Sequence, residues 1–354
     1  MDHSDLGQPR AVAEDDLALI DAMHLHPRSS FAQLGQTLGL SPTTVSRHWR
    51  GLEERGEAWV SSVPGPAWRF TGALVDIDAL PADIDAVSTA LAQLPTVVSI
   101  HITGGVPAMY ALVLTADQSL MEHTVLEAIA HTPGVTAVTP LLMSELFAGR
   151  TWSLRALSRE QQWRVAPPTP TATDAESLTE LDRALFLCLQ RDGRMTAQQL
   201  AHELGMPEHT IRRRVDRLIT DGVLAFRTDF VRPAGGWTIQ VALSLAVPSD
   251  LLREVGNSIA TWPETRVCGS VVGDANLFVT VQLHQVQALE PLVARIQQRW
   301  PAVSVQRRRL VLRSVKSWGR ILQRDGRAAS TIAVDPWFSP SPPAPPPPHA
   351  PQSA

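Results

Sequence analysis

The chain of 354 residues carries an internal duplication, and this feature constrains the fold more than any other. Residues 16–56 match a second stretch 166 positions later without a gap, as Asp16 and Asp182 illustrate. A second match follows at an offset of 168 positions, where Gly105 meets Gly273. The matched positions mix apolar, glycine and charged residues, which helical periodicity alone does not produce. The sequence therefore predicts four units in the order A-B-A′-B′.

Unit A is predicted to contain three helices. In the second copy, three stretches have apolar residues at helical spacing: Leu181, Leu185 and Leu189, then Leu200 and Leu204, then Ile211, Val215 and Leu218. Between the last two stretches, Gly205 permits a tight turn and Pro207 suits the start of a new helix. Residues 223–226 and 229–231 are predicted to form a small hairpin, the wing of a winged helix-turn-helix.

Unit B alternates strands and helices. In the first copy the pattern predicts strand 74–77, helix 84–94, strands 97–103 and 109–115, helix 120–131 and strand 135–142, and the same order returns between 239 and 312. This βαββαβ order is the ferredoxin-like arrangement. The predicted fold class is therefore α+β, with two winged helix-turn-helix domains alternating with two βαββαβ domains.

The domain boundaries follow from these patterns and from two stretches rich in proline. They predict a disordered N-terminus 1–13, helix-turn-helix domains 14–66 and 177–234, βαββαβ domains 67–150 and 235–325, a linker 151–176 and a Pro-rich disordered tail 326–354. The tail is predicted to be dispensable from Pro336 onward, because it has almost no apolar periodicity to bury.

The third helix of each unit A presents arginine on the face opposite its apolar stripe. Arg213 holds this position in the second copy, and Arg47 holds it in the first. Arginine can clamp guanine or phosphate, while Thr and His can donate to phosphates. Double-stranded DNA is therefore the predicted partner, and its predicted contacts are Thr43, Thr44, Ser46, Arg47, Arg50, His209, Thr210, Arg212, Arg213 and Arg217. The first copy is predicted to read DNA more weakly, because Gly51 replaces Arg217.

Composition neither supports nor excludes DNA binding. The net charge of −4 means that a DNA-binding surface has to be a local basic patch. Cys188 and Cys268 belong to no metal-ligand spacing, so no metal, cofactor or disulfide framework is expected. The sequence has neither a run of 18 apolar residues nor a signal-peptide pattern, which predicts a cytoplasmic protein without a membrane partner.

The runs 204–206, 210–218 and 222–224 resemble the Lrp/AsnC, or feast/famine, family of transcription regulators. The resemblance covers residues 14–316 as two tandem copies. It implies a helix-turn-helix joined to a βαββαβ domain that dimerises and senses small molecules, often amino acids. Ordinary members carry one copy per chain, so this tandem chain is predicted to form its own pseudo-dimer. A higher homo-oligomer is the alternative.

In that family a turn resembling G-x-x-D lies near the effector site. The corresponding candidate effector-binding residues are Gly104, Gly105, Gly273, Asp274 and Asn276. Asn276 stands where an acid is common, and the first copy has no acid at all. An ammonium group needs such a partner, so the sequence gives little support to an amino acid as the effector. A small-molecule effector stays a candidate partner, and the sequence does not identify it. The glycines are equally well explained as turn residues with positive φ.

Two other functions remain open from the sequence. Sirohaem decarboxylases resemble the same fold, and they would need His, Arg or Tyr side chains that converge on a tetrapyrrole, for which unit B offers His101 and Tyr110. The second alternative is an interaction scaffold that has lost its DNA contacts. No catalytic residue is predicted, because no Ser/His/Asp order, Walker motif or dinucleotide fingerprint occurs.

Overall fold

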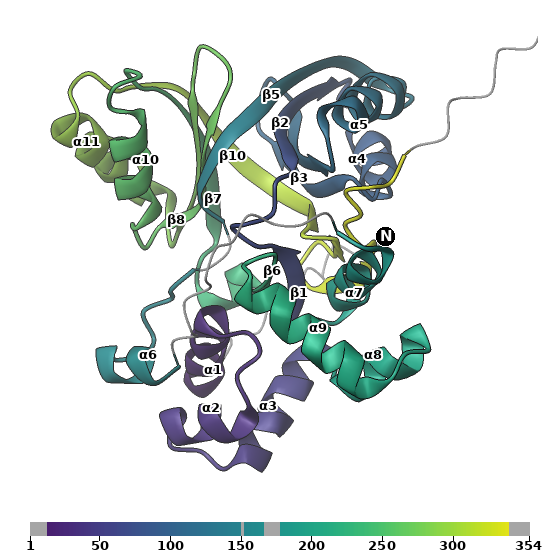
Figure 1. The fold of residues 1–354 in the computed structure, drawn as a ribbon. Coiled ribbons are helices and arrows are strands. Elements are labelled where there is room, and N and C mark those ends of the chain that lie inside the picture. Colours follow the sequence, from purple (N-terminus) through teal and green to yellow (C-terminus); the bar gives the residue numbers. More distant parts are fainter. Residues whose placement is uncertain (1–12, 150–151, 166–177, 340–354) are drawn as a thin grey trace, which may run out of the picture.

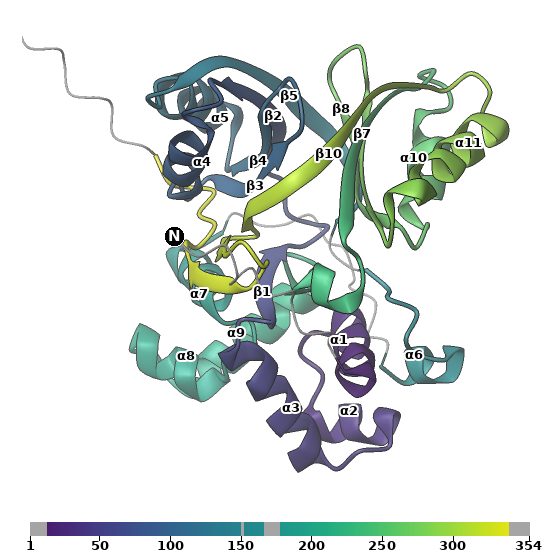
Figure 2. The same cartoon turned by 180° about the vertical axis from the view of Figure 1, so that it is seen from behind.

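A computed structural model describes residues 13–149, 152–165 and 178–339. The helix-turn-helix elements of both copies lie at one end of the molecule, and a large sheet with its covering helices lies at the other (Figure 1; Figure 2). No helix of the described part is long and apolar enough to cross a membrane.

The first helix-turn-helix is built from α1 (Glu14–Leu25), α2 (Phe31–Leu38) and α3 (Pro42–Glu54). Ser30 and Ser41 cap α2 and α3, because each side chain accepts a hydrogen bond from the backbone three residues later. The buried apolar faces of the three helices meet in one core: Leu19, Ile20, Met23, Leu34, Val45, Trp49 and Leu52.

The second helix-turn-helix repeats this construction with α7 (Glu180–Arg191), α8 (Ala197–Leu204) and α9 (Glu208–Thr220). Gly205 ends α8 in the left-handed region at φ 64°, as Gly39 ends α2 at φ 72°. These paired glycines produce the turn that the sequence predicts between the second and third helix of each copy.

The predicted wing is wrong. Residues 224–230 form a single strand, β6 (Leu224–Phe230), whose partner is β1 (Ala58–Pro64) of the other copy. The two antiparallel strands occupy equivalent positions of the duplication, and their register is symmetric about the pair Ser61 and Arg227. A local pseudo-two-fold axis therefore passes through this two-stranded ribbon and relates the two helix-turn-helix units.

Two successions of elements follow the order βαββαβ. The first comprises β2 (Thr71–Ala79), α4 (Ile84–Ala92), β3 (Val97–Thr103), β4 (Met109–Thr115), α5 (Gln118–His123), the π-helical turn η2 (Thr124–Ile129) and β5 (Val135–Ala148). The second comprises β7 (Ile239–Ala246), α10 (Leu252–Ala260), β8 (Thr265–Val271), β9 (Leu277–Leu283), the short η4 (Val286–Ala288), α11 (Leu289–Arg299) and β10 (Ser304–Ser317). Each unit buries apolar strand residues beneath its own two helices.

The two units pair with each other inside one chain. The long strand β5 of the first unit pairs with β8 of the second, and β10 of the second pairs with β3 of the first. Together with the pairing of β7 and β10, these contacts join the eight strands into a closed ring. A third apolar cluster fills part of its interior: Leu74, Tyr110, Ala242, Val271 and Phe278.

The predicted linker is partly wrong, because residues 152–165 form a packed strap that ends in α6 (Arg159–Val165). Trp152 is buried in the core of the first helix-turn-helix. The Asp21 carboxylate accepts hydrogen bonds from the backbone of this strap, beginning with Leu154 at 2.7 Å. Residues 166–176 lie outside the described residues, as do residues 1–12 of the predicted N-terminal segment.

The tail also starts later than the sequence suggests. Residues 320–331 contain the strands β11 (Arg320–Leu322) and β12 (Ala328–Thr331), which extend the sheet from β10. Beyond them, Val334 is fully buried, and the Trp337 ring lies 5.3 Å from that of Trp68. Deletion from Pro336 would therefore remove packed residues. Residues 340–354 lie outside the described part of the chain.

Candidate functional site

The outer faces of α3 and α9 carry exposed arginines. Arg47 and Arg50 on α3 and Arg213 on α9 are exposed, and each is free of ion pairs and hydrogen bonds to the residues that the structure describes. The buried residues Val45 and Ile211 lie on the opposite side of their helices. The guanidinium groups of these three arginines are therefore available to phosphates and base edges.

The other predicted DNA contacts differ in their exposure and in whether they already have a polar partner. Arg212 pairs with Glu208, and Arg217 pairs with Asp221 at 3.2 Å, both along α9. Thr43 and His209 are exposed, whereas Thr44, Ser46 and Thr210 are half-buried. The hydroxyls of Thr44 and Thr210 have neighbours within hydrogen-bond distance, Ser41 at 2.8 Å and His209 at 3.3 Å. The three unpaired arginines are thus the most available groups of the predicted set.

Arg214 has a structural role in α9. Its guanidinium donates two hydrogen bonds of 2.5 Å to the buried carboxylate of Asp182, which anchors α9 to α7. The first copy has the same clamp, because His48 contacts Asp16 at 2.8 Å. The sequence match of Asp16 with Asp182 was the signal for this clamp.

A reciprocal contact joins the two helix-turn-helix units. Arg28 donates to the carbonyl oxygens of Gly193 and Met195 at 2.5 and 3.1 Å. Arg194, its equivalent in the duplication, donates to those of Pro27 and Ser29 at 2.6 and 3.0 Å. Charge-assisted bonds of this kind are strong, and here they are repeated across the pseudo-two-fold axis. They hold the two units in one relative orientation.

The candidate effector residues lie in two hairpin turns. Gly104, Gly105, Gly273 and Asp274 are exposed. The side chain of Asn276 is committed to the backbone of Val247, with an acceptor and a donor contact of 2.9 Å each. Neither of the two cavities described below is lined by these turns. Their role in effector binding stays a prediction.

A buried charged cluster that the sequence analysis did not find lies between the ribbon and the closed sheet. Arg227 donates to both oxygens of Asp229 at 2.6 and 3.0 Å, and Arg266 donates to one of them at 2.8 Å. Arg232 stands 3.5 Å from the same carboxylate. Burial alone would raise the pKa of the Asp229 carboxyl, but Arg227 and Arg266 hold it well below its usual range.

His101 and Tyr110 do come together beside this cluster. Their ring centroids are 4.8 Å apart, and both side chains face the interior of the closed sheet. Burial lowers the pKa of His101 to about 3, so the imidazole is neutral. The cavity that both residues line, together with Arg227, Arg232 and Arg266, measures about 20 Å³. This volume suits one water-sized group.

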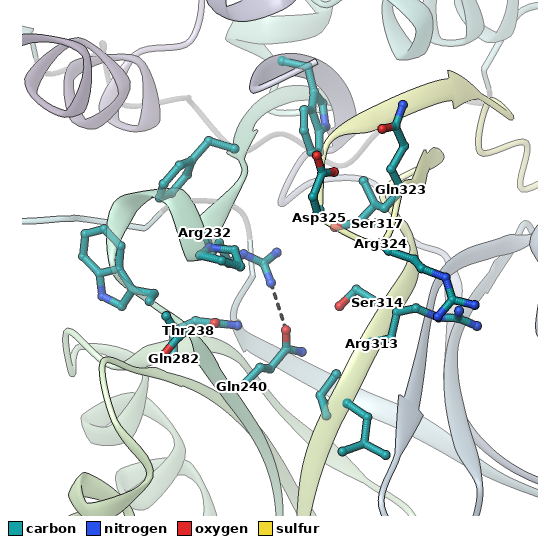
Figure 3. A pocket seen from close by; sticks show the side chains of 18 residues that line it. Arg232, Thr238, Gln240, Gln282, Arg313, Ser314, Ser317, Gln323, Arg324 and Asp325 are labelled. Atoms are coloured by element: carbon teal, nitrogen blue, oxygen red, sulfur yellow. Dashed lines mark hydrogen bonds between the residues drawn. The ribbon is translucent and has the colours of Figure 1, made fainter. Parts of the chain in front are cut away.

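A larger cavity of about 140 Å³ adjoins Arg232 (Figure 3). It lies between the short helix η3 (Arg232–Gly235), the start of β7, the end of β10 and the turn 323–326. Arg232 donates to Gln240 at 3.0 Å within it. Among the residues that the structure describes, His, Cys, Asp and Glu nowhere form a group of three that could hold a metal ion.

Comparison with known proteins agrees with the geometry of the helix-turn-helix units. The AsnC-type helix-turn-helix domain matches residues 178–219. An HTH-type transcriptional regulator of Pyrococcus abyssi is 32% identical over 143 residues, which cover 40% of this chain and 90% of that protein. The regulator LrpA of Mycobacterium tuberculosis is 28% identical over 123 residues, covering 34% of this chain and 82% of that protein.

A solved structure resembles most of the chain. The siroheme decarboxylase NirDL aligns over 86% of this chain and 93% of its own, with a TM-score of 0.57 and 15% sequence identity. At this identity the likeness establishes the shared fold alone. The helix-turn-helix match and the regulator relatives confirm the prediction from the sequence, and the chain belongs to the Lrp/AsnC family of DNA-binding transcriptional regulators.

Proposed function

We propose that one chain binds two half-sites of duplex DNA, one through α3 and the other through α9. The observation that carries this proposal is the reciprocal contact of Arg28 and Arg194, which fixes two arginine-bearing helices relative to each other. The symmetric ribbon of β1 and β6 supports the same orientation. A two-fold pair of recognition helices addresses half-sites about 34 to 36 Å apart, one turn of DNA.

The two half-sites are expected to differ. Where α9 has Arg217, α3 has Gly51, and where α3 has Arg50, α9 has Asp216. Arg50 adds positive charge to α3, while the exposed Asp216 repels phosphate on α9. The operator is therefore expected to be an unequal pair of sequences rather than a palindrome.

Replacing Arg213 with Ala is expected to weaken specific DNA binding by roughly 5- to 150-fold, the loss of about 1 to 3 kcal/mol that follows when a base contact is removed. Arg47→Ala should weaken binding through the other half-site. The measurement is fluorescence anisotropy with the chain's own promoter DNA at fixed salt concentration. Arg253→Ala is the matched control, because Arg253 is exposed on α10, far from α3 and α9 (Figure 1).

Unchanged affinity and sequence preference in both Arg213→Ala and Arg47→Ala would contradict this assignment of the helices. Absence of any salt-sensitive binding by the unmodified chain would favour the interaction scaffold instead, because phosphate contacts make DNA affinity depend on salt.

In solution the chain is expected to be a monomer of 38.6 kDa, because the pairing of the two βαββαβ units is satisfied internally. Light scattering at low concentration measures the mass, and a nuclease footprint on a mapped operator measures the number of half-sites. An obligate dimer whose footprint holds two equivalent palindromic sites would refute the internal pair. A higher homo-oligomer would show as a concentration-dependent mass.

The geometry favours a regulator without enzymatic activity. A tetrapyrrole-decarboxylating enzyme would need its macrocycle to reach His101 and Tyr110, but the cavity beside them holds about 20 Å³. The adjoining cavity of about 140 Å³ is smaller than the roughly 300 to 1,000 Å³ of sites for drug-sized ligands. A further cavity of about 570 Å³ shares Trp237 and Gln282 with it, but neither His101 nor Tyr110 lines that cavity.

A further inference from the structure

Only the second copy of the duplication contributes charged residues to the buried cluster. Arg227, Asp229, Arg232 and Arg266 all come from the second copy. The equivalent positions of the first copy hold Ser61, Val63, Pro66 and Val98. Since the first copy folds in the same way without these charges, the fold itself does not require them. A bound ligand would account for their presence.

The cluster carries more positive than negative charge. Three guanidinium groups face the single carboxylate of Asp229, which leaves an excess of two positive charges. Arg227 and Arg266 are buried, and Arg232 keeps only 13% of its side chain exposed. The Nε of Arg266 has no hydrogen-bond partner. Buried charge is unfavourable unless it is paired, so this region favours an anion.

The cavity beside Arg232 offers unpartnered donors of its own. Gln282 and Trp59 are among the residues that line it, and the side-chain amide Nε2 of Gln282 and the indole Nε1 of Trp59 are buried without a hydrogen-bond partner. Only 2% of Gln282 and 6% of Trp59 is exposed. Unsatisfied buried donors are rare in proteins, and an acceptor bound in the cavity would satisfy them.

The lining also sets the shape of the ligand. Ser314 and Ser317 face the cavity from β10, opposite Arg232 and Gln240 (Figure 3). Arg313 and Arg324 extend to the other side of β10, where both approach Asp85. The remaining wall combines the apolar side chains of Trp59, Phe230, Trp237, Val311, Leu312 and Leu322 with the polar ones of Thr238, Gln323 and Asp325. The carboxylate of Asp325 lies 3.7 Å from Arg327, which balances its charge. A matching ligand has one anionic head and a short apolar body.

We propose that this cavity binds a small carboxylic acid, whose carboxylate contacts Arg232, Gln282 Nε2 and Trp59 Nε1. The site lies between the ribbon that joins the helix-turn-helix units and the closed sheet. It is separate from the hairpin turns that contain Gly105 and Gly273.

Isothermal titration of the full chain with the sodium salts of acetate, propionate, butyrate and succinate tests the proposal, with sodium phosphate and sodium chloride as separate arms. At least one carboxylate is expected to bind saturably. Arg232→Gln should raise its Kd by about tenfold or more, because a charge-assisted contact is lost. Arg324→Gln is the matched control, since this side chain borders the same cavity but is 73% exposed. Its Kd should stay within about twofold.

Gln282→Met provides a second variant if Arg232→Gln does not fold, because it removes an amide that makes no hydrogen bond through Nε2. It too should weaken carboxylate binding. No saturable binding by any of the four carboxylates up to about 10 mM would overturn the proposal. Binding of phosphate or chloride alone would also overturn it, and so would equal losses in Arg232→Gln and Arg324→Gln.

A role of this acid as effector rests on the proposed DNA-binding function. If the acid is an effector, saturating carboxylate should change promoter affinity in the unmodified chain and leave it unchanged in Arg232→Gln. The titration contains no DNA, so it tests carboxylate binding independently of DNA binding. Loss of carboxylate binding and loss of DNA binding can therefore be told apart.

Discussion

Replacing Asp229 with Asn is expected to lower the free energy of unfolding by about 3 to 5 kcal/mol, the usual loss when one partner of a buried ion pair is removed. The substitution keeps the shape of the side chain but removes the single carboxylate that faces Arg227, Arg232 and Arg266. Three guanidinium groups would then lie together without a counter-charge. Urea denaturation followed by circular dichroism measures the change.

Glu160→Gln is the matched control for this experiment. Glu160 pairs with Arg164 one turn away on α6, and the two side chains are 73% and 51% exposed. Such a surface pair contributes less than about 1 kcal/mol. An equal loss of unfolding free energy in Asp229→Asn and Glu160→Gln would show that the three arginines do not need Asp229 as a counter-charge.

Replacing Lys316 with Met is expected to have the opposite effect and to stabilise the protein at pH 7 by about 3 to 5 kcal/mol. Lys316 is fully buried on β10, and burial lowers its pKa from 10.5 to about 7. Its amino group donates one hydrogen bond of 3.0 Å to the Leu94 carbonyl. That carbonyl also accepts from the backbone of Val97, so the substitution does not leave it unpaired.

The stabilisation should depend on pH in a defined direction. Between pH 7 and 10.5 the unfolded chain carries a proton on Lys316 that the folded chain has released, so the unmodified protein gains stability as the pH rises. The gain is about 1.4 kcal/mol per pH unit, and Lys316→Met lacks it. The difference between the two proteins should therefore shrink from pH 7 to pH 10.

The difference between the two unfolding curves isolates Lys316 from other groups. Burial raises the pKa of the Cys268 thiol to about 12, but this contribution is the same in both proteins. A difference that stays constant across pH 7 to 10 would show that the lysine is protonated in the folded chain.

The sequence predicted the alternation of units well because the duplication is a long-range signal. A match of Asp16 with Asp182 or of Arg28 with Arg194 carries information about both copies at once. These matches predicted the two helix-turn-helix units. The structure adds that Asp16 and Asp182 anchor the third helix within each unit, while Arg28 and Arg194 join the two units. The prediction of a wing was wrong because the apolar pattern of residues 223–231 indicates a strand but does not indicate which strand pairs with it. That partner, β1, lies in the other copy.

The tail and the cavity could not be predicted for a different physical reason. The high proline content near the C-terminus makes single large residues such as Trp337 hard to recognise as part of the core. The ring of Trp337 packs against those of Trp68 and Phe186, which are distant in the sequence. The residues of the cavity are equally scattered: Trp59, Arg232 and Gln282 belong to three separate elements. Neither the aromatic residues around Trp337 nor the residues of the cavity follow a regular spacing in the sequence, because only the fold brings them together.

The centre of the ribbon also bears on how such a chain can evolve. In a dimer of identical subunits, a residue on the two-fold axis faces its own copy, so an arginine there would oppose another arginine across the strand pair. Here Arg227 faces Ser61. Joining the two halves in one chain allows each to change alone, so a charge at the axis becomes tolerable. A symmetric ancestor could not have acquired Arg227 without repulsion between its two subunits.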